Sequence, residues 1–345
     1  MQGSIFVLRI KFSAGGQFCA SKSASSPSAK TLAENFEKLN AENDMLKKIL
    51  NLILLIILLN ILNSCQFSSL FHRANKLEKN KNFNNMPPFT INGEKHHIER
   101  DALESTIFIF KDTVRLNKTY EIKPIDFLSK SGNKLSGLLL SPKNNLRTDL
   151  IFLHYHGSAG NLLGYHFQMV SQLTEKGFQV FTFDYSGYGF SDGKATRKNV
   201  LTDAYSALDF IKNNPIFKNK KVVIFGQSYG GHLASVVGSN RQNDIEGIII
   251  EGAFYSHRKE AVYTAGFVAN IVYDGIRAEK EIKKNKKPIL IIHSKEDKRT
   301  PIKFGRKIFD EANEPKYFME IDKNHLEGLQ YYGDSIIVKI NEIFR

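Results

Sequence analysis

The stretch Val222–Val236, VVIFGQSYGGHLASV, predicts an abrupt passage from a strand into a helix. It opens with apolar, β-branched and aromatic residues and closes with a helix-forming run, and Ser228 stands between Gly226 and Gly230 at the junction. A turn this sharp crowds the backbone, and neighbours without a Cβ relieve the crowding. We therefore expect Ser228 at the tip of the turn, where the free N–H groups of a helix N-terminus favour a developing negative charge.

Outward from this stretch, strand-like apolar runs alternate with amphipathic runs of helical spacing. The strand-like runs are residues 149–157, 178–187, 221–228, 245–254, 287–297 and 316–322. Before them, residues 106–114 and 123–142 are typical of antiparallel strands, with a turn at Ser131–Asn133. The alternation predicts an α/β fold with a central, mostly parallel sheet of about eight strands, helices on both faces and an antiparallel start. We expect one domain over residues 103–345.

A serine hydroxyl becomes a nucleophile when a base removes its proton, and the base needs an acid to orient it. Where the nucleophile sits on such a strand–turn–helix junction, the chain order is serine, then Asp or Glu, then histidine. Only His293 and His325 lie in the last part of the chain; His293 is within a predicted strand, whereas His325 is on a loop. His325 is therefore the predicted base, and its alternative is a surface position at a helix start.

The predicted acid is Asp297, which comes just past a strand end and shortly before Pro301 at the start of the next helix. Its neighbour Glu296 and, after the preceding strand, Glu251 are alternatives. Asp322 is expected to cap or turn the loop that carries the base.

Two main-chain N–H groups are expected to stabilise an oxyanion: that of Tyr229, directly after the serine, and that of Ser158, after the strand over residues 149–157. Each such donor is typically worth about 10²–10³ in rate. His156 is expected to shape the loop through a bond from its ring to the backbone. The segment HGSAGN lacks the lysine and the glycine spacing of a phosphate-binding loop.

The composition argues against several classes of function. The formal net charge is +13, but the densest basic run, residues 279–288, mixes signs and has no aromatic residue to stack on bases. We therefore expect no nucleic acid partner. Cys19 and Cys65 both precede the predicted domain, and the pair His96–His97 lacks carboxylate or cysteine partners at ligand spacing. We expect neither a metal nor another cofactor.

Residues 45–65, MLKKILNLILLIILLNILNSC, have the three zones of a secretory signal: a basic start, an apolar centre and a small residue before Cys65. The final LNSC resembles a bacterial lipobox, whose cysteine is lipidated. This pattern predicts a cell-envelope lipoprotein translated from Met45, with residues 1–44 as an upstream extension. The alternatives are an uncleaved membrane anchor and a transit peptide within residues 1–33.

Residues 66–102 are rich in asparagine and lysine, show no apolar period and contain Pro87–Pro88. They predict a polar, loosely ordered tether between the N-terminal segment and the domain.

Five motifs occur in order at fitting spacings: HYHGSAGN (His154–Asn161), FDYSGYGFSDG (Phe183–Gly193), GQSYGG (Gly226–Gly231), HSKEDKRTP (His293–Pro301) and NHLEG (Asn324–Gly328). Together they resemble the α/β-hydrolase superfamily, and within it the short-lid, esterase-like serine hydrolases that carry HGxAGN and are often membrane-anchored. The likeness covers about residues 120–335.

The resemblance implies Ser228 as nucleophile, Asp297 as acid, His325 as base, and Ser158 and Tyr229 as oxyanion donors. It also implies that Asp184 and Tyr185 shape the pocket. Ser294 stands where the family usually has glycine, and Thr300 where valine is common; neither change removes a catalytic group.

The segment Tyr255–Lys287, where relatives insert a lid, is short and predicts about one helix and a connector. We therefore expect an open site bounded by aromatic residues such as Phe254, Tyr255 and Phe267.

The predicted function is a cofactor-independent serine hydrolase that cleaves carboxylic esters or thioesters through an acyl-enzyme, on a small-molecule or lipid-like substrate. Its alternatives are a serine peptidase or amidase with the same triad, and a non-catalytic binding protein of this fold. An aspartate-nucleophile hydrolase is excluded because position 228 is serine. The sequence predicts membrane association through the N-terminal segment and makes no prediction of oligomeric state.

Overall fold

The computed structural model describes residues 30, 34, 37–38, 41–53, 72–77, 88–91, 94–101, 106–144, 147 and 149–344. The chain divides into two units, Met1–Leu59 and Asn60–Arg345.

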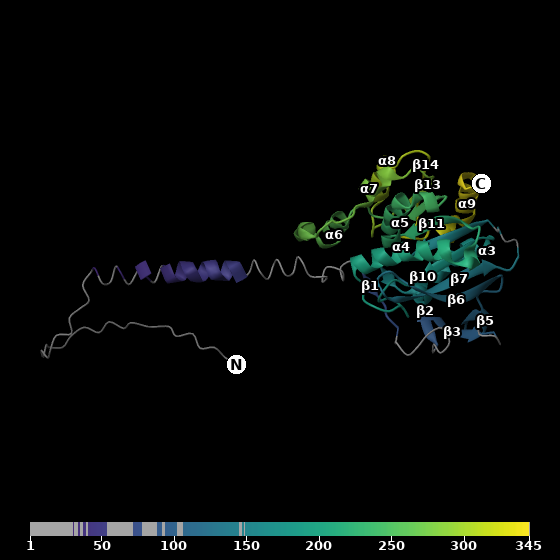
Figure 1. The fold of residues 1–345 in the computed structure, drawn as a ribbon. Helices are drawn as coiled ribbons and strands as arrows, with labels where there is room; N and C mark the ends of the chain where they lie inside the picture. Colours follow the sequence, from purple (N-terminus) through teal and green to yellow (C-terminus); the bar gives the residue numbers. More distant parts are fainter. Residues whose placement is uncertain are drawn as a thin grey trace. The chain divides into compact units, whose positions relative to one another are not determined.

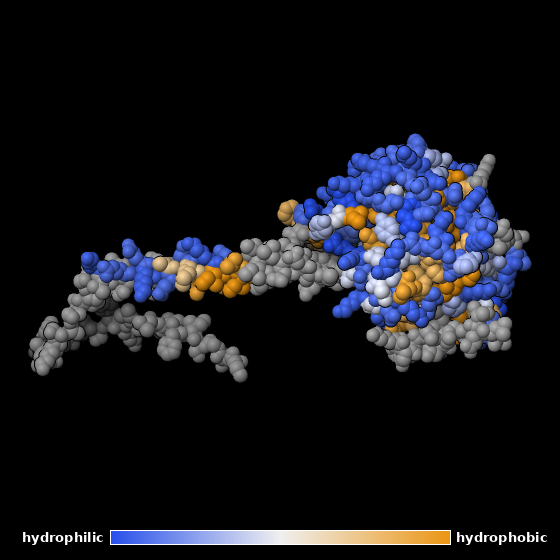
Figure 2. Space-filling model, viewed as in Figure 1, coloured by the Kyte–Doolittle hydropathy of each residue, from blue (hydrophilic) through white to orange (hydrophobic). Residues whose placement is uncertain are grey.

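In the first unit, residues 41–53 are helical. Their apolar side chains are largely exposed and gather toward the C-terminal end of the helix (Figure 2). Among the described residues, no helix combines the length and the apolar character that crossing a membrane requires. The predicted lipidation site, Cys65, lies outside the described residues, as do residues 54–71, so the signal-peptide and lipoprotein hypotheses stay predictions.

The second unit is built on a large mixed sheet (Figure 1). In the described residues its strand order is β14-β13-β12-β11-β8-β10-β7-β6-β4-β3-β2, with β5 paired to β4. From β14 to β10 all neighbours are parallel, and from β10 to β2 they are antiparallel. The parallel strands are β8 (Leu150–Tyr155), β10 (Gln179–Phe183), β11 (Lys221–Gln227), β12 (Gly247–Glu251), β13 (Ile289–Ser294) and β14 (Lys316–Ile321).

The antiparallel part of the sheet begins earlier than the sequence predicts. Its strands are β2 (Phe89–Ile91), β3 (Glu94–Arg100), β4 (Ile107–Lys111), β5 (Val114–Arg115), β6 (Tyr120–Leu128) and β7 (Lys134–Pro142). The expectation of a loosely ordered tether is wrong for β2 and β3, because their backbones pair in the sheet. Strand β2 has only three residues and β3 is mostly polar, so neither gives an apolar pattern long enough to predict a strand. The sheet is correspondingly wider than the eight strands predicted.

Helices cover both faces of the sheet, as predicted. On one face, Leu208 of α4, Leu233 of α5 and Ile308 of α8 belong to one buried cluster; on the other, Phe167 of α3 and Leu329 of α9 belong to a second. The helices are α3 (Phe167–Glu175), α4 (Arg197–Asn213), α5 (Tyr229–Asn240), α6 (His257–Ala265), α7 (Ala278–Glu281), α8 (Ile302–Glu311) and α9 (Gly328–Ile343), with short turns η2 (Leu162–His166), η3 (Pro215–Phe217), η4 (Gln242–Asp244), η5 (Phe267–Ile271) and η6 (Ile282–Lys284).

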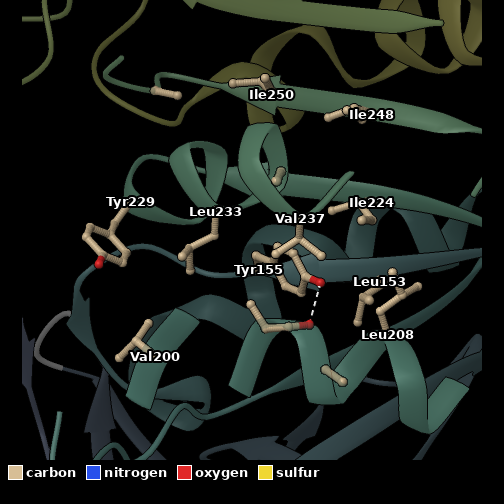
Figure 3. Close-up of a cluster of buried hydrophobic side chains, with 14 of the residues drawn as sticks. Leu153, Tyr155, Val200, Leu208, Ile224, Tyr229, Leu233, Val237, Ile248 and Ile250 are labelled. Atoms are coloured by element: carbon tan, nitrogen blue, oxygen red, sulfur yellow. Dashed lines mark hydrogen bonds between the residues drawn. The ribbon is translucent and has the colours of Figure 1, made fainter. Parts of the chain in front are cut away.

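The side chains of the central strand β8 alternate between the two buried clusters. Ile151, Leu153 and Tyr155 point into the cluster under α4 and α5, whereas Leu150 and Phe152 point into the opposite one. Alternation with period two is what a strand requires when both faces are buried. Tyr155 crosses to α4, where its hydroxyl donates a 2.6 Å hydrogen bond to the carbonyl of Ala204 (Figure 3). The C-terminal end of β8 is thereby held against the helix layer.

Candidate active site

The turn between β11 and α5 has the strained geometry that its sequence predicts. Ser228 has φ 53° and ψ −115°, a conformation that side-chain-bearing residues rarely adopt. A Cβ on Gly226 would lie 2.3 Å from the carbonyl oxygen of Gly230, and one on Gly230 would lie 1.8 Å from that of Tyr155. Only glycine fits at either position, and the close approach of α5 to β8 depends on it.

Asp297 and His325 meet at the carboxyl ends of β13 and β14. Nδ1 of His325 donates a 2.6 Å hydrogen bond to Oδ2 of Asp297, while Oδ1 accepts from the N–H groups of Arg299 and Thr300 at 2.9 and 2.8 Å. Burial alone would raise the pKa of Asp297, but the hydrogen bond and charge of His325 outweigh it and hold this pKa below its ordinary value. Asp297 is therefore an ionised acceptor that fixes the orientation of the imidazole.

The second ring nitrogen of His325, Nε2, takes no part in the bond to Asp297. Nε2 is buried and has no hydrogen-bond partner among the described residues. A Cβ on Gly252 would lie 3.2 Å from the His325 ring, and the N–H of Ser228 donates to the adjacent carbonyl of Glu251 over 2.8 Å. The imidazole thus lies beside the segment that supports the serine, in the tautomer that leaves Nε2 as the proton acceptor.

The alternative acids and base have other partners. The carboxylate of Glu251 accepts from Nε2 of Gln227 and from the N–H of Gly328, both at 2.7 Å. Glu296 is exposed, and Asp322 accepts a hydrogen bond from the Tyr332 hydroxyl. His293 is fully buried in β13, with Nε2 bonded to the carbonyl of Thr300 at 2.7 Å. None of these bonds joins His325, so the geometry favours Asp297.

The loop after β8 carries the second predicted oxyanion donor. The ring of His156 bonds through Nδ1 to the carbonyl of Gly157 at 2.6 Å, as expected of a loop-shaping residue. Because N–H and C=O point in opposite directions across a trans peptide, this bond turns the N–H of Ser158 the other way. In the described part of the chain, neither that N–H nor the N–H of Tyr229 donates to another main-chain carbonyl. A Cβ on Gly157 would lie 3.6 Å from the Cβ of Ser228, so this loop passes close to the serine.

Asp184 and Tyr185 hold this segment through hydrogen bonds and are not part of the described lining of the cavity. Both are buried; Asp184 accepts from the N–H of Leu162 at 3.0 Å, and the Tyr185 hydroxyl donates to the carbonyl of His156 at 3.1 Å. Burial raises the pKa of Asp184 to about 8. They shape the site through the loop that they hold.

A short segment that sequence reasoning placed in the tether also belongs to the site. We call residues 72–77 the strap. Its strand β1 (Arg73–Ala74) runs parallel to β9 (Ala159–Gly160), and the N–H of Arg73 donates to the carbonyl of Ser158 at 2.8 Å. The hydroxyl of Tyr188 donates to the same carbonyl at 2.9 Å and lies 3.0 Å from Nδ1 of His72. Nothing in the sequence of the strap, HRANKL, indicates this position.

A cavity of about 760 Å³ opens over the serine. Ser158, Ser228 and Tyr229 line it, together with Phe254, Ala159 and Arg73. Helix α6 contributes Glu260, Tyr263, Thr264 and Ala265, and the loop after Asp297 contributes Lys298 and Arg299. Of the predicted aromatic boundary, Phe254 lies in the wall, Tyr255 packs against Phe304, and Phe267 is 83% exposed. Sequence reasoning missed Tyr263 and the three cationic residues.

Comparisons with known proteins bear on the fold and the family of this chain. A family model described as serine aminopeptidase, S33, matches residues 147–272. The uncharacterized protein YfhR of Escherichia coli K12 is 30% identical over 225 residues, which are 62% of this chain and 78% of YfhR. Lysophosphatidylserine lipase ABHD12 of Macaca fascicularis is 29% identical over 193 residues, 49% of this chain and 47% of that protein.

Among solved structures, the esterase Pf2001 of Pyrococcus furiosus matches with a TM-score of 0.56 at 18% identity, over 65% of this chain and 90% of the esterase. Est1E of Butyrivibrio proteoclasticus, solved with ferulic acid, matches with a TM-score of 0.55 at 20% identity, over 64% and 98%. Likenesses this distant establish the fold class of α/β-hydrolases. The chain belongs to the same family as YfhR, and the matching family model together with these folds supports the α/β-hydrolase superfamily.

Proposed function

We propose that this protein is a serine hydrolase that cleaves carboxylic esters through an acyl-enzyme. Ser228 attacks the carbonyl carbon, His325 takes the serine proton through Nε2 and returns it to the leaving oxygen, and Asp297 stabilises the imidazolium. The N–H groups of Ser158 and Tyr229 receive the oxyanion. Water then attacks the acyl-enzyme by the same proton route, and the acid and the free serine result.

The observation that carries this proposal is the bond of 2.6 Å between His325 and Asp297, with the opposite ring nitrogen unpartnered among the described residues. A histidine ring held by a carboxylate at Nδ1 has its basic nitrogen at Nε2, the arrangement that activates a serine. The strained backbone of Ser228 supports the same assignment, because such strain is concentrated at functional sites.

The test is covalent labelling with a fluorophosphonate probe and mass mapping of the modified peptide. We expect one adduct, on Ser228, that disappears in Ser228→Ala and His325→Ala. The matched control is Ser235→Ala, which removes from the same helix a hydroxyl bonded to the carbonyl of Gly231 and leaves labelling intact. Folded protein that is not labelled would support the alternative, a non-catalytic binding protein.

A peptidase with the same residues is the second candidate, because the matching family model is described as a serine aminopeptidase. Esters need less protonation of the leaving group than amides do, which favours the ester. Turnover of 4-nitrophenyl valerate and of alanine 4-nitroanilide by the same preparation separates the two. Faster turnover of the anilide would assign the peptidase.

Attachment to a membrane through residues 45–65 is part of the proposed function, and a lipid-like ester is the substrate it suits. The exposed apolar side chains of the helix over residues 41–53, among them Leu46 and Leu50, support it. The mass of the N-terminal peptide of the native protein tests it. A lipidated Cys65 is expected, and an unmodified Cys65 in a protein recovered free of membranes would contradict it.

A further inference from the structure

The strap, residues 72–77, is fastened to two loops of the candidate site. Besides the bond from Arg73 to Ser158, the N–H of Asn75 donates to the carbonyl of Gly160 at 3.0 Å. The carbonyl of Asn75 in turn accepts from the N–H of Gly189, also at 3.0 Å. These are main-chain bonds, so they do not depend on which side chain stands at position 73.

This fastening places the side chain of Arg73 in the wall of the cavity that Ser228 and Ser158 line. Among the described residues, the Arg73 guanidinium forms no ion pair and no hydrogen bond. A guanidinium presents five donors in a planar fork that matches carboxylate and phosphate oxygens. An unpaired one beside a nucleophile is therefore available to a ligand.

The other charged residues of the wall add to the same field. Lys298 and Arg299 are the further cations, and Glu260 is the one carboxyl in the described lining. Burial, with a smaller contribution from the charge of Asp297, raises the pKa of Glu260 to about 8, although Arg299 lowers it. At neutral pH the wall therefore carries three positive charges and a carboxyl that is mostly uncharged. The net charge of the described lining is therefore positive, and its three cations are exposed to solvent and to a ligand.

We propose that Arg73 is a specificity residue that binds an anionic group, a carboxylate or a phosphate, on the ester substrate. The proposal rests on the proposed function for its reaction and on the strap for its geometry. Lys298 and Arg299 assist by attracting the same group. The segment that follows the predicted N-terminal anchor thus supplies part of the substrate site.

The experiment compares two esters with equal acyl length and the same leaving group: mono-4-nitrophenyl glutarate, which ends in a carboxylate, and 4-nitrophenyl valerate, which ends in a methyl group. The readout is kcat/KM for the glutarate ester divided by kcat/KM for the valerate ester, measured with the full-length protein. Arg73→Gln is expected to lower this ratio about tenfold, the effect of one charge-assisted contact. Arg73→Lys is expected to restore part of it, since it keeps the charge without the fork.

The control is Lys76→Gln, which removes a strap cation that lies outside the cavity lining and bonds to the carbonyl of Gly193 at 3.3 Å. Its ratio should stay that of wild type. A ratio that is the same in wild type and Arg73→Gln would overturn the role of Arg73. Equal losses on both esters would do so as well, because they would mean that Arg73 only holds the loop.

A further experiment distinguishes failure of the anion site from failure of the proposed hydrolase function. If wild type hydrolyses neither ester, calorimetry with hexyl phosphate and with hexanol still tests the cation site. Tighter binding of hexyl phosphate that weakens about tenfold in Arg73→Gln would keep the anion site. Equal affinity for the two compounds would exclude it.

Discussion

The hydroxyl of Ser294 donates a hydrogen bond to the main-chain carbonyl of Lys323, two residues before His325. The same oxygen accepts from the N–H of Glu296 at 3.0 Å, directly before Asp297. Ser294 therefore links the loop that carries Asp297 to the loop that carries His325. A departure from the family pattern that looked neutral in the sequence has a structural role.

Replacing Ser294 should misalign the acid and the base. We expect Ser294→Ala and Ser294→Gly to lower kcat by about three- to tenfold with little change in KM, since one hydrogen bond between the two loops is lost. Steady-state kinetics on 4-nitrophenyl valerate measures this. An unchanged kcat with a lower Tm would limit the bond to a role in stability.

The choice of acid is tested by exchanging each carboxylate for its amide. Asp297→Asn should lower kcat by about 10²–10⁴ because the amide favours the wrong tautomer of His325. Glu251→Gln should instead lower Tm, because Glu251 accepts two hydrogen bonds, from Gln227 and from Gly328. The reverse pattern in the kinetics would make Glu251 the acid.

Tyr188 is predicted to position the oxyanion loop. Its hydroxyl donates its only hydrogen to Ser158, so Nδ1 of His72 must be the donor to Tyr188. Burial, and then Arg197, lower the pKa of His72 to about 3, which keeps the ring neutral. Tyr188→Phe should lower kcat about tenfold with KM nearly unchanged, since the donors act mainly on the transition state. If KM rises and kcat holds, Tyr188 serves ground-state binding.

The raised pKa of Glu260 predicts that the stability of the protein depends on pH. Its pKa is about 8 in the folded protein against an ordinary value of 4.5, so between these values the folded state holds a proton that the unfolded state has lost. The stability from this neutral carboxyl is complete below about pH 4.5 and is lost as the pH rises through about 8.

Tm measured between about pH 5 and 9 should therefore fall with rising pH, and it should fall less in Glu260→Gln. Asp184, whose pKa is also about 8, accounts for part of the remaining slope. Glu246→Gln, a change at an exposed carboxylate, is the control. An unchanged slope in Glu260→Gln would contradict the assignment.

The sequence determined the order of strands and helices in the parallel part of the sheet and the position of the turn at Ser228. Apolar runs such as residues 222–225 are strands for local reasons, and Gly226 and Gly230 fit beside Ser228 because the turn has no room for a Cβ. Chain order then pointed to Asp297 and His325, which the structure brings together.

Only the tertiary structure decided which polar segments join the site. The strap and strand β3 show no apolar period. They are held in place by main-chain bonds to Ser158, Gly160 and β4. Main-chain bonding of this kind leaves no mark on side-chain pattern. Likewise, the cationic wall gathers Arg73 and Lys298 from distant parts of the chain. Residues this far apart in the sequence meet only because the folded backbone brings them together, and no local stretch of sequence predicts that.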